Sequence, residues 1–203
     1  MVHSFQAAGV SLPGKGNWAK ALPDSYLAFS PREQELDLFL TEGRFYRKAL
    51  QAMVSTFYQE TGPPGARLTG ALRAADRKVS ADLAEREDAD ELDWSLLGIG
   101  NIAHVEFGKL TCAWVGSGRI YVVREGCLLW QNKPHTVAQA LIEAGHDPQS
   151  VRSFIHVLMQ GFGNAINPAS PRSWRSVCSS PAIKSSSVRR LWDSCLRARQ
   201  SLR

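Results

Sequence analysis

Four short apolar runs separated by glycine-containing turns occupy the middle of this sequence and constrain its fold more than any other feature. The runs are residues 96–107, 110–115, 119–123 and 127–130. Gly108, Gly118 and Gly126 lie in the separating segments, and glycine tolerates the positive φ angles of tight turns. Runs of this length and spacing predict an antiparallel meander of β-strands.

Two amphipathic patterns that precede the meander predict helices. Phe45, Ala49, Met53 and Phe57 recur every four residues and form one apolar stripe, which ends before the Pro-Pro-Gly of residues 63–65. A second helix has Asp82 among the residues of its polar face, and its apolar stripe consists of Leu68, Ala71, Leu72, Ala75, Val79 and Leu83.

The remaining segments give weaker signals. Residues 25–30 suit a short strand, residues 135–144 predict a helix that ends at Gly145, and residues 151–159 are also expected to be helical. Residues 164–187 are expected to be rich in loops, and residues 188–203 predict a basic amphipathic helix. We expect all of these segments to belong to a single domain of residues 1–203.

The composition is that of an ordinary globular protein. Hydrophobic residues make up 44% of the 203 residues and charged residues 21%, so disorder is not expected. No apolar run approaches the ~20 residues that span a bilayer, and residues 1–10 lack the pattern of a signal peptide. We therefore expect a cytoplasmic protein. The four cysteines contain no CxxC pair, which argues against structural zinc and favours reduced thiols.

The basic C-terminal segment allows two interpretations. Residues 172–203 contain eight Lys or Arg and one acid, Asp193. The apolar face of the expected helix could pack against a sheet. Alternatively, Arg189, Arg190, Trp192 and Arg197 could dock on an acidic or phosphorylated partner or on an anionic lipid surface. Nucleic acid ranks lower as a partner because no recognisable binding motif accompanies the charge.

The segment CAWVGSGRIYVVREGCLLW, residues 112–130, resembles a signature of the PP2C-type (PPM family) metal-dependent protein Ser/Thr phosphatases. In that signature a strand ends in Val-Gly-Asp-Ser-Arg and an Arg-Asp-Gly hairpin follows. Val115-Gly116, Arg119 and Arg124-Glu125-Gly126 match it, whereas Ser117 stands where the aspartate would be. PHTVAQALIEAG, residues 134–145, resembles the Asp-His-Ser/Thr helix of bacterial members.

This resemblance implies a fold of the α+β class, a PP2C-like four-layer αββα sandwich of antiparallel sheets. The family's final Asp-Asn motif is not found, so a fold truncated at its C-terminus is part of the expectation. In the family, several aspartates hold two Mg²⁺ or Mn²⁺ ions that activate a bridging water.

By the same resemblance, a small set of residues corresponds to the family's site. Asp24, Glu42 and Gly43 stand at metal-ligand positions, and Lys20 stands next to the position of the phosphate-binding arginine. Ser117 and Ser180 occupy positions where the family has acids, and a hydroxyl is a poor ligand for a hard divalent ion. We therefore expect one Mn²⁺ or Mg²⁺ ion or none rather than two. A displaced acid, Asp37 or Asp193, is an alternative ligand.

Three hypotheses about function follow. The leading one is a pseudophosphatase that binds a phosphoprotein or a Ser/Thr kinase and regulates it. The second is a divergent Mn²⁺- or Mg²⁺-dependent phosphatase that hydrolyses phosphoserine and phosphothreonine. The third is a non-enzymatic interaction module that uses the basic C-terminal helix. Catalysis by a Ser-His-Asp triad has no support from a GxSxG motif.

Overall fold

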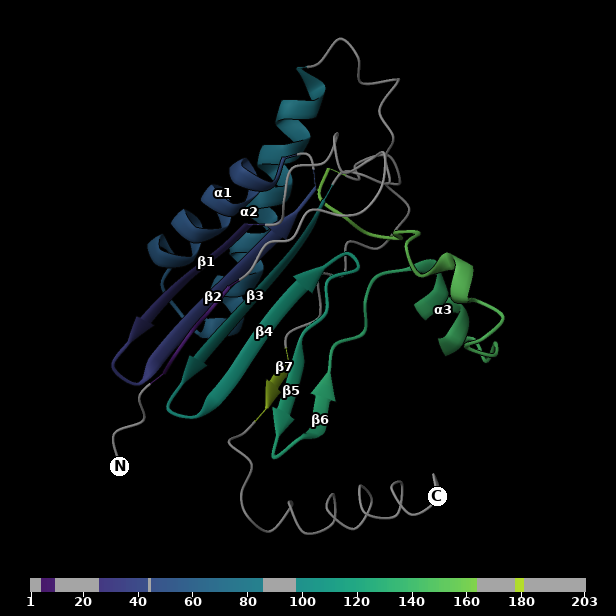
Figure 1. Ribbon diagram of the computed structural model, residues 1–203. Helices are drawn as coiled ribbons and strands as arrows, with labels where there is room; N and C mark the ends of the chain where they lie inside the picture. The colour runs from purple at the N-terminus through teal and green to yellow at the C-terminus, as the bar shows by residue number, and fades with distance from the viewer. Residues whose placement is uncertain (1–4, 10–25, 44, 86–97, 164–177, 181–203) are drawn as a thin grey trace.

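A computed structural model of the chain describes residues 5–9, 26–43, 45–85, 98–163 and 178–180 (Figure 1). Its main sheet has five antiparallel strands in the order β1-β2-β3-β4-β7. These strands are β1 (Tyr26–Arg32), β2 (Glu35–Glu42), β3 (Ile99–Glu106), β4 (Lys109–Val115) and β7 (Cys178–Ser180). A second sheet consists of the hairpin β5 (Tyr121–Arg124) and β6 (Cys127–Gln131).

Two long helices cover one face of the main sheet (Figure 1). They are α1 (Tyr46–Gln59) and α2 (Pro64–Ala84), and both predicted apolar stripes are buried. The stripes pack on the side chains that alternate strand residues present to the same face, Phe39, Ile102, Ala113 and Val115. This alternation places the main core between the helices and the sheet.

The opposite face of the main sheet packs against the β5–β6 hairpin. Cys112 and Trp114 of β4 form a second buried cluster there, with Ile120 and Trp130 packed against it. The Trp114 and Trp130 rings meet edge to face with their centroids 6.0 Å apart. Helices, sheet and second sheet therefore follow one another in layers, and the expected mixture of helices and antiparallel sheets is confirmed.

Glycine-containing turns connect the strands as the sequence predicts. Phe107 and Gly108 between β3 and β4 have φ angles of 47° and 72°, and Glu125 and Gly126 between β5 and β6 have φ angles of 51° and 75°. Two successive residues with positive φ are the mark of a type I′ turn, whose twist matches that of the strands it joins.

A short helix, α3 (Val137–Glu143), follows the hairpin and lies beyond it, away from α1 and α2 (Figure 1). Thr136 caps its N-terminus, because its Oγ1 accepts a hydrogen bond of 3.3 Å from the Gln139 N–H. Gly145, with a φ of 96°, ends the helix in a Schellman-type turn as predicted. None of the described helices is long and apolar enough to cross a membrane.

Three sequence-based expectations need correction. Strand β2 was not predicted, although Leu36, Leu38 and Leu40 alternate along it as in a strand. Residues 151–159 are not an α-helix: one 3-10 turn, η4 (Arg152–Phe154), is followed by a chain segment that pairs with the residues before α3. Asp82 is buried rather than on an exposed face. The loop-rich segment 164–187, apart from β7, and the predicted helix 188–203 lie outside the described residues.

Candidate functional site

At one end of the main sheet, where β2 and β4 terminate and β3 begins, Glu42 and Gly43 lie near the turn that contains Ser117. Strand β2 ends at Glu42, which pairs with Ile99 at the start of β3, and Gly100 of β3 pairs with Val115 at the end of β4. We call this the Glu42 edge, defined by Glu42, Gly43, Ile99 and residues 116–118. Two strand spacings separate β2 from β4, so the backbones at Glu42 and Ser117 are about 10 Å apart.

The turn from β2 into α1 presents Glu42 to solvent. Gly43 is buried and has a φ of 111°, a conformation that L-residues with a side chain rarely adopt. Its carbonyl accepts a hydrogen bond of 3.2 Å from the Tyr46 N–H, and the Thr41 hydroxyl donates one of 2.8 Å to the Tyr46 carbonyl. These bonds hold the turn, so the exposed Glu42 carboxylate stands on a defined backbone and could bind a cation.

The turn after β4 is held from the segment that precedes α3. The Gly116 carbonyl accepts a hydrogen bond of 2.9 Å from the His135 N–H. The Asn132 side chain is buried, donates 2.8 Å to the Gly118 carbonyl and accepts 2.7 Å from the Ile120 N–H. Ser117, between these anchors, is half-buried. Ser117, which stands where the resemblance has an aspartate, is therefore held at the Glu42 edge by hydrogen bonds on both sides of it.

Close backbone approach requires glycine at several points of this edge. A Cβ on Gly98, whose φ is 127°, would lie 2.9 Å from the Glu42 carbonyl oxygen. The Phe162 ring lies directly against Gly100, and the Phe162 N–H donates a hydrogen bond of 3.0 Å to the Gly98 carbonyl. Residues 98–100 and 161–163, two glycine-containing segments that are distant in the sequence, thus pack against each other.

Buried polar groups lie beside the edge. Asn101 on β3 is 6% exposed and touches Gly118, and its Oδ1 has no hydrogen-bond partner among the described residues. The His135 ring stacks on Trp114, and burial lowers the pKa of His135, so its imidazole is neutral at pH 7. An amide oxygen and a carboxylate are both ligand types that hard divalent ions accept.

The structure places only part of the predicted site. Glu42 and Gly43 lie together at the Glu42 edge, whereas Asp24 and Lys20 lie outside the described residues. Residues 42–43 and 116–118 contain one carboxylate, that of Glu42. Within the described parts of the chain, no three His, Cys, Asp or Glu side chains are grouped so as to hold a metal ion.

Two expectations do not agree with the structure: the position of Ser180 at the site and the alternative ligand Asp37. Ser180 pairs with Leu110 at the start of β4, seven residues before Ser117, so it lies about 20 Å from the Glu42 edge. The reason is that β7 runs antiparallel to β4, so β7 ends at the opposite end of the sheet from the Glu42 edge. Asp37 is 1% exposed beneath α1 and is committed to protein partners, so it is not a displaced metal ligand.

Those partners, the buried His104 and the partly exposed Tyr58, form a polar cluster around Asp37 that sequence reasoning missed. Asp37 Oδ1 lies 2.7 Å from His104 Nδ1, and the Tyr58 hydroxyl donates a hydrogen bond of 2.7 Å to Asp37 Oδ2. Burial raises the pKa of Asp37, but the hydrogen bonds with His104 and Tyr58 outweigh it and hold that pKa below its usual value. The hydrogen bond with Asp37 raises the pKa of His104, against the effect of burial. The sequence did contain a signal for this cluster. Leu36, Leu38 and Leu40 alternate as on one face of a strand, which places Asp37 on the opposite face, the one that the helices cover.

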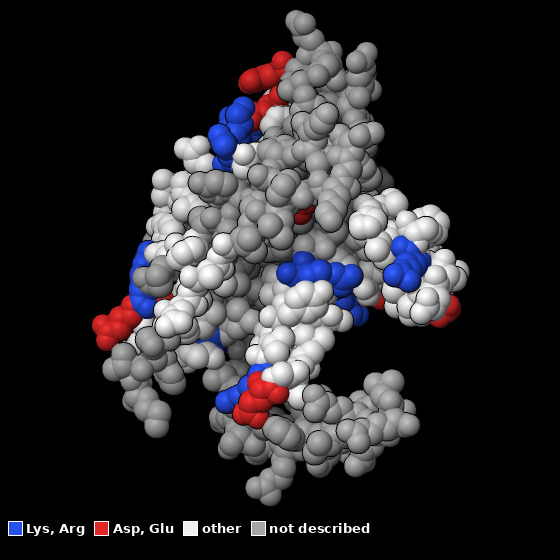
Figure 2. Space-filling view, in the orientation of Figure 1, with Lys and Arg blue, Asp and Glu red and all other residues white. Residues whose placement is uncertain are grey.

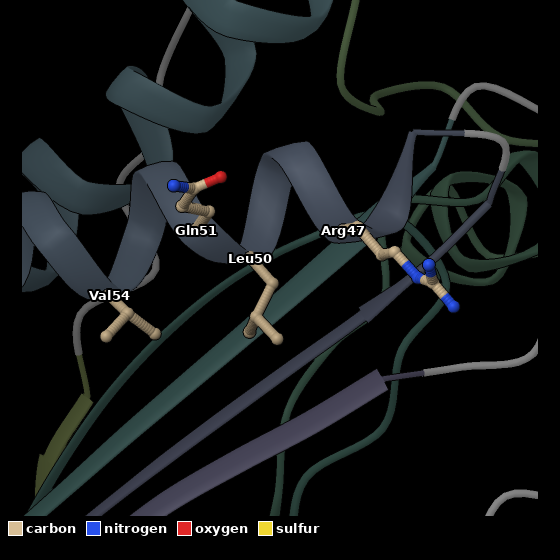
Figure 3. A pocket seen from close by; sticks show the side chains of 4 residues that line it. All are labelled: Arg47, Leu50, Gln51 and Val54. Carbon is tan, nitrogen blue, oxygen red and sulfur yellow. The ribbon is translucent and has the colours of Figure 1, made fainter.

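A shallow pocket of about 580 Å³ lies on α1 (Figure 3). Its lining residues, Arg47, Leu50, Gln51 and Val54, follow helical spacing beside the buried stripe. Among the described residues, Arg47 is the one charged residue that lines it, beside the apolar Leu50 and Val54. These three side chains suit an apolar or anionic group.

Charged side chains do not gather into one region in the view of Figure 2. The described Lys, Arg, Asp and Glu residues occur there as small separate groups. The residues expected to bind a partner, Arg189, Arg190, Trp192 and Arg197, lie outside the described part of the chain.

Comparison with known proteins identifies the fold. No family model matches the sequence, and no curated protein matches it either. Among the solved structures that match, three have a TM-score of 0.50 each. The first is the PPM Ser-Thr phosphatase MsPP from Mycobacterium smegmatis, crystallised with cacodylate, at 15% identity over 80% of this chain and 65% of that one.

The second is the catalytic domain of the serine/threonine protein phosphatase PstP in complex with two manganese ions, at 20% identity over 81% of this chain and 66% of that one. The third is the serine/threonine phosphatase of S. agalactiae, at 15% identity over 91% of this chain and 74% of that one. The chain thus spans about two thirds of the first two structures. The α+β fold is PP2C-like, as the sequence predicts.

Proposed function

We propose that this chain is a PP2C-like pseudophosphatase that binds a phosphoprotein or a Ser/Thr kinase and regulates it without efficient hydrolysis. The observation that carries the proposal is the composition of the Glu42 edge, where two strand ends and the turns after them offer one carboxylate. The proposed partner class follows from the solved neighbours, whose names describe them as Ser/Thr phosphatases.

The chemistry of divalent ions supports a weakened metal site. Two ions that share one site bring four positive charges, which several carboxylates must balance. Glu42 supplies one negative charge, and the Ser117 hydroxyl supplies none. Asp24 is the further acid that the resemblance assigns, which makes two carboxylates, and the alternative acid Asp193 lies outside the described residues. A single bound Mn²⁺ or Mg²⁺ ion, or none, is the occupancy that this donor set favours.

A divergent phosphatase is the second candidate, and one observation favours it. Tyr26 of β1 pairs with Thr41, so β1 begins at the same edge at which β2 ends. Asp24 precedes Tyr26 by two residues in the sequence. A site formed by Asp24, Glu42 and water molecules could hold one Mn²⁺ ion and retain slow hydrolysis of phosphoserine or phosphothreonine.

Calorimetric titration with Mn²⁺, run in parallel with a p-nitrophenyl phosphate assay, separates the two candidates. The pseudophosphatase proposal expects at most one bound ion and no turnover above the buffer rate. Glu42→Gln should abolish any Mn²⁺ binding, whereas Glu125→Gln, a matched control in the β5–β6 turn, should leave it unchanged. Turnover above the buffer rate that Asp24→Ala abolishes, with either one or two bound ions, would overturn the proposal in favour of the enzyme.

Partner binding needs its own measurement. A phosphothreonine peptide and its unphosphorylated twin, each titrated into the full chain, should differ in affinity by at least tenfold if the fold recognises the phosphate. Equal affinities would contradict phosphoprotein binding. If deletion of residues 188–203 abolishes binding and Glu42→Gln leaves it intact, the basic C-terminal segment is the binding element, and the chain is the non-enzymatic interaction module.

A further inference from the structure

Two cysteines that are 66 positions apart in the sequence occupy opposed positions in the main sheet. Cys112 of β4 pairs with Cys178 of β7 in the antiparallel register. Cys112 has 0% exposure and belongs to the buried cluster between the two sheets. The cysteines are far apart along the chain, and the pairing of β7 with β4 brings two of them to opposed positions.

The register satisfies the main geometric condition for a disulfide. Directly opposite residues of an antiparallel pair lie on the same face, with Cα atoms about 4.5 Å or 5.5 Å apart depending on the hydrogen-bond pattern. Disulfides span Cα separations of about 4.4–6.8 Å. Both Cα separations lie in that range, and a small adjustment of the short strand β7 would bring the two Cβ atoms from about 4.5–5.5 Å to the ~3.5–4.5 Å that a disulfide requires.

From this juxtaposition we propose that Cys112 and Cys178 form a reversible disulfide that cross-links β7 to β4. The oxidant is a low-molecular-weight disulfide such as oxidised glutathione. One cysteine thiolate attacks a sulfur of that disulfide and releases one small thiol; the other thiolate then attacks the mixed disulfide and releases the second. The protein loses two electrons and two protons, and the small disulfide gains them as two thiols.

The position of β7 gives the bond a structural effect. Strand β7 has three residues, ends the strand order and pairs only with β4 in the described sheet. A short edge strand opens more readily than an inner one, and opening exposes the sulfur of Cys112 to the oxidant. Once formed, the bond closes a loop that contains β5, β6 and α3, which restricts the unfolded chain. The inference is independent of the proposed binding function.

The test uses the full chain with Cys127→Ser and Cys195→Ser, which retains only Cys112 and Cys178. After treatment with oxidised glutathione, a thiol count under denaturing conditions should fall from two to none. A non-reducing peptide map should show the two cysteine peptides joined, with no glutathione retained. Dithiothreitol should restore both thiols, and the oxidised form should unfold at a higher temperature than the reduced form.

Further variants keep the test decisive if a substitution disturbs folding. Cys178→Ser, which leaves the buried Cys112 in place, should abolish the cross-link and the thermal shift. If the doubly substituted chain does not fold by circular dichroism, the same peptide map is made on the unsubstituted protein. Persistent thiols, a stable mixed disulfide with glutathione, a link to Cys127 or Cys195, or a link between two molecules would each overturn the proposal.

Discussion

At the residue scale, the pairing of two neighbouring strands brings Asp37 into contact with His104, and this contact shifts the pKa of both residues. The two residues are directly opposite in the β2–β3 register, and both are almost fully buried. Protonated His104 is stabilised because Asp37 Oδ1 accepts a hydrogen bond from its Nδ1–H, and Asp37 Oδ2 accepts a second hydrogen bond from the Tyr58 hydroxyl. A buried pair of this kind makes stability depend on pH.

The direction of that dependence follows from the two pKa shifts. The pKa of Asp37 is lowered on folding, so its stabilising contribution is present above the unfolded value of about 3.9 and is lost as the pH falls through the folded value. The pKa of His104 is raised, so its contribution is complete below about 6.5 and is lost as the pH rises through the folded value. The pair stabilises most between these limits.

We expect His104→Gln to lower the free energy of unfolding by about 3 kcal/mol at pH 6, the typical cost of breaking a buried pair, and by less at pH 9. Urea denaturation of the two proteins at both pH values measures the difference. His156→Gln, at an exposed histidine, is the matched control and should cost little at either pH. A cost for His104→Gln that is the same at pH 6 and pH 9 would show that His104 does not change its protonation state between these pH values, which would contradict the prediction.

At the scale of elements, an ion-paired carboxylate joins α1 to α2. Asp82 of α2 is 7% exposed, and its two oxygens lie 2.7 Å from Lys48 Nζ of α1 and 3.0 Å from Lys78 Nζ of its own helix. The hydrogen bond from Lys48 is the main reason that the pKa of Asp82 is lowered, with burial opposing it. Each lysine remains about half exposed, so each alone contributes little.

A double-mutant cycle tests this arrangement. Lys48→Met and Lys78→Met should each lower the free energy of unfolding by less than about 1 kcal/mol, because the other lysine still pairs with Asp82. The double variant should cost about 1 kcal/mol more than the sum, since it leaves a buried carboxylate without a cation. Strict additivity in chemical denaturation would mean that the lysines act independently of the shared carboxylate.

At the scale of the whole molecule, order should decrease from the centre of the main sheet toward the hairpin. Strand β3 pairs on both sides and is buried from Ile99 to His104. Strands β5 and β6 pair only with each other in the described structure, and Tyr121, Val123 and Leu128 are exposed there. The Trp114–Trp130 contact is the principal aromatic link between the two sheets.

Native-state hydrogen exchange should therefore be slowest in β3 and faster in β5 and β6. Trp130→Ala removes an aromatic pair and should raise exchange in the hairpin by about tenfold while leaving β3 almost unchanged. Tyr121→Ala, which removes an exposed ring from the same hairpin, should have a smaller effect. Equal acceleration in β3 and the hairpin would mean that the two sheets open as one unit.

The sequence by itself determined the elements whose signals are local. The glycine turns, the Gly145 helix end and the apolar stripes of α1 and α2 follow from preferences of a few neighbouring residues, and the structure confirms each of them. The PP2C-like fold was predictable because these elements occur in a characteristic order. Glu42 and Gly43 could likewise be chosen as candidate site residues from the motif alone, although the strand that ends at Glu42 was not predicted.

Only the tertiary structure decided which distant residues meet. The pairing of Asp37 with His104, the burial of Asp82 and the opposition of Cys112 and Cys178 depend on strand register and helix packing. Ser180, which the sequence assigned to the candidate site, lies at the other end of the sheet because β7 runs antiparallel to β4. Strand direction and register are set by the whole core rather than by neighbouring residues, which is why no local pattern contained them.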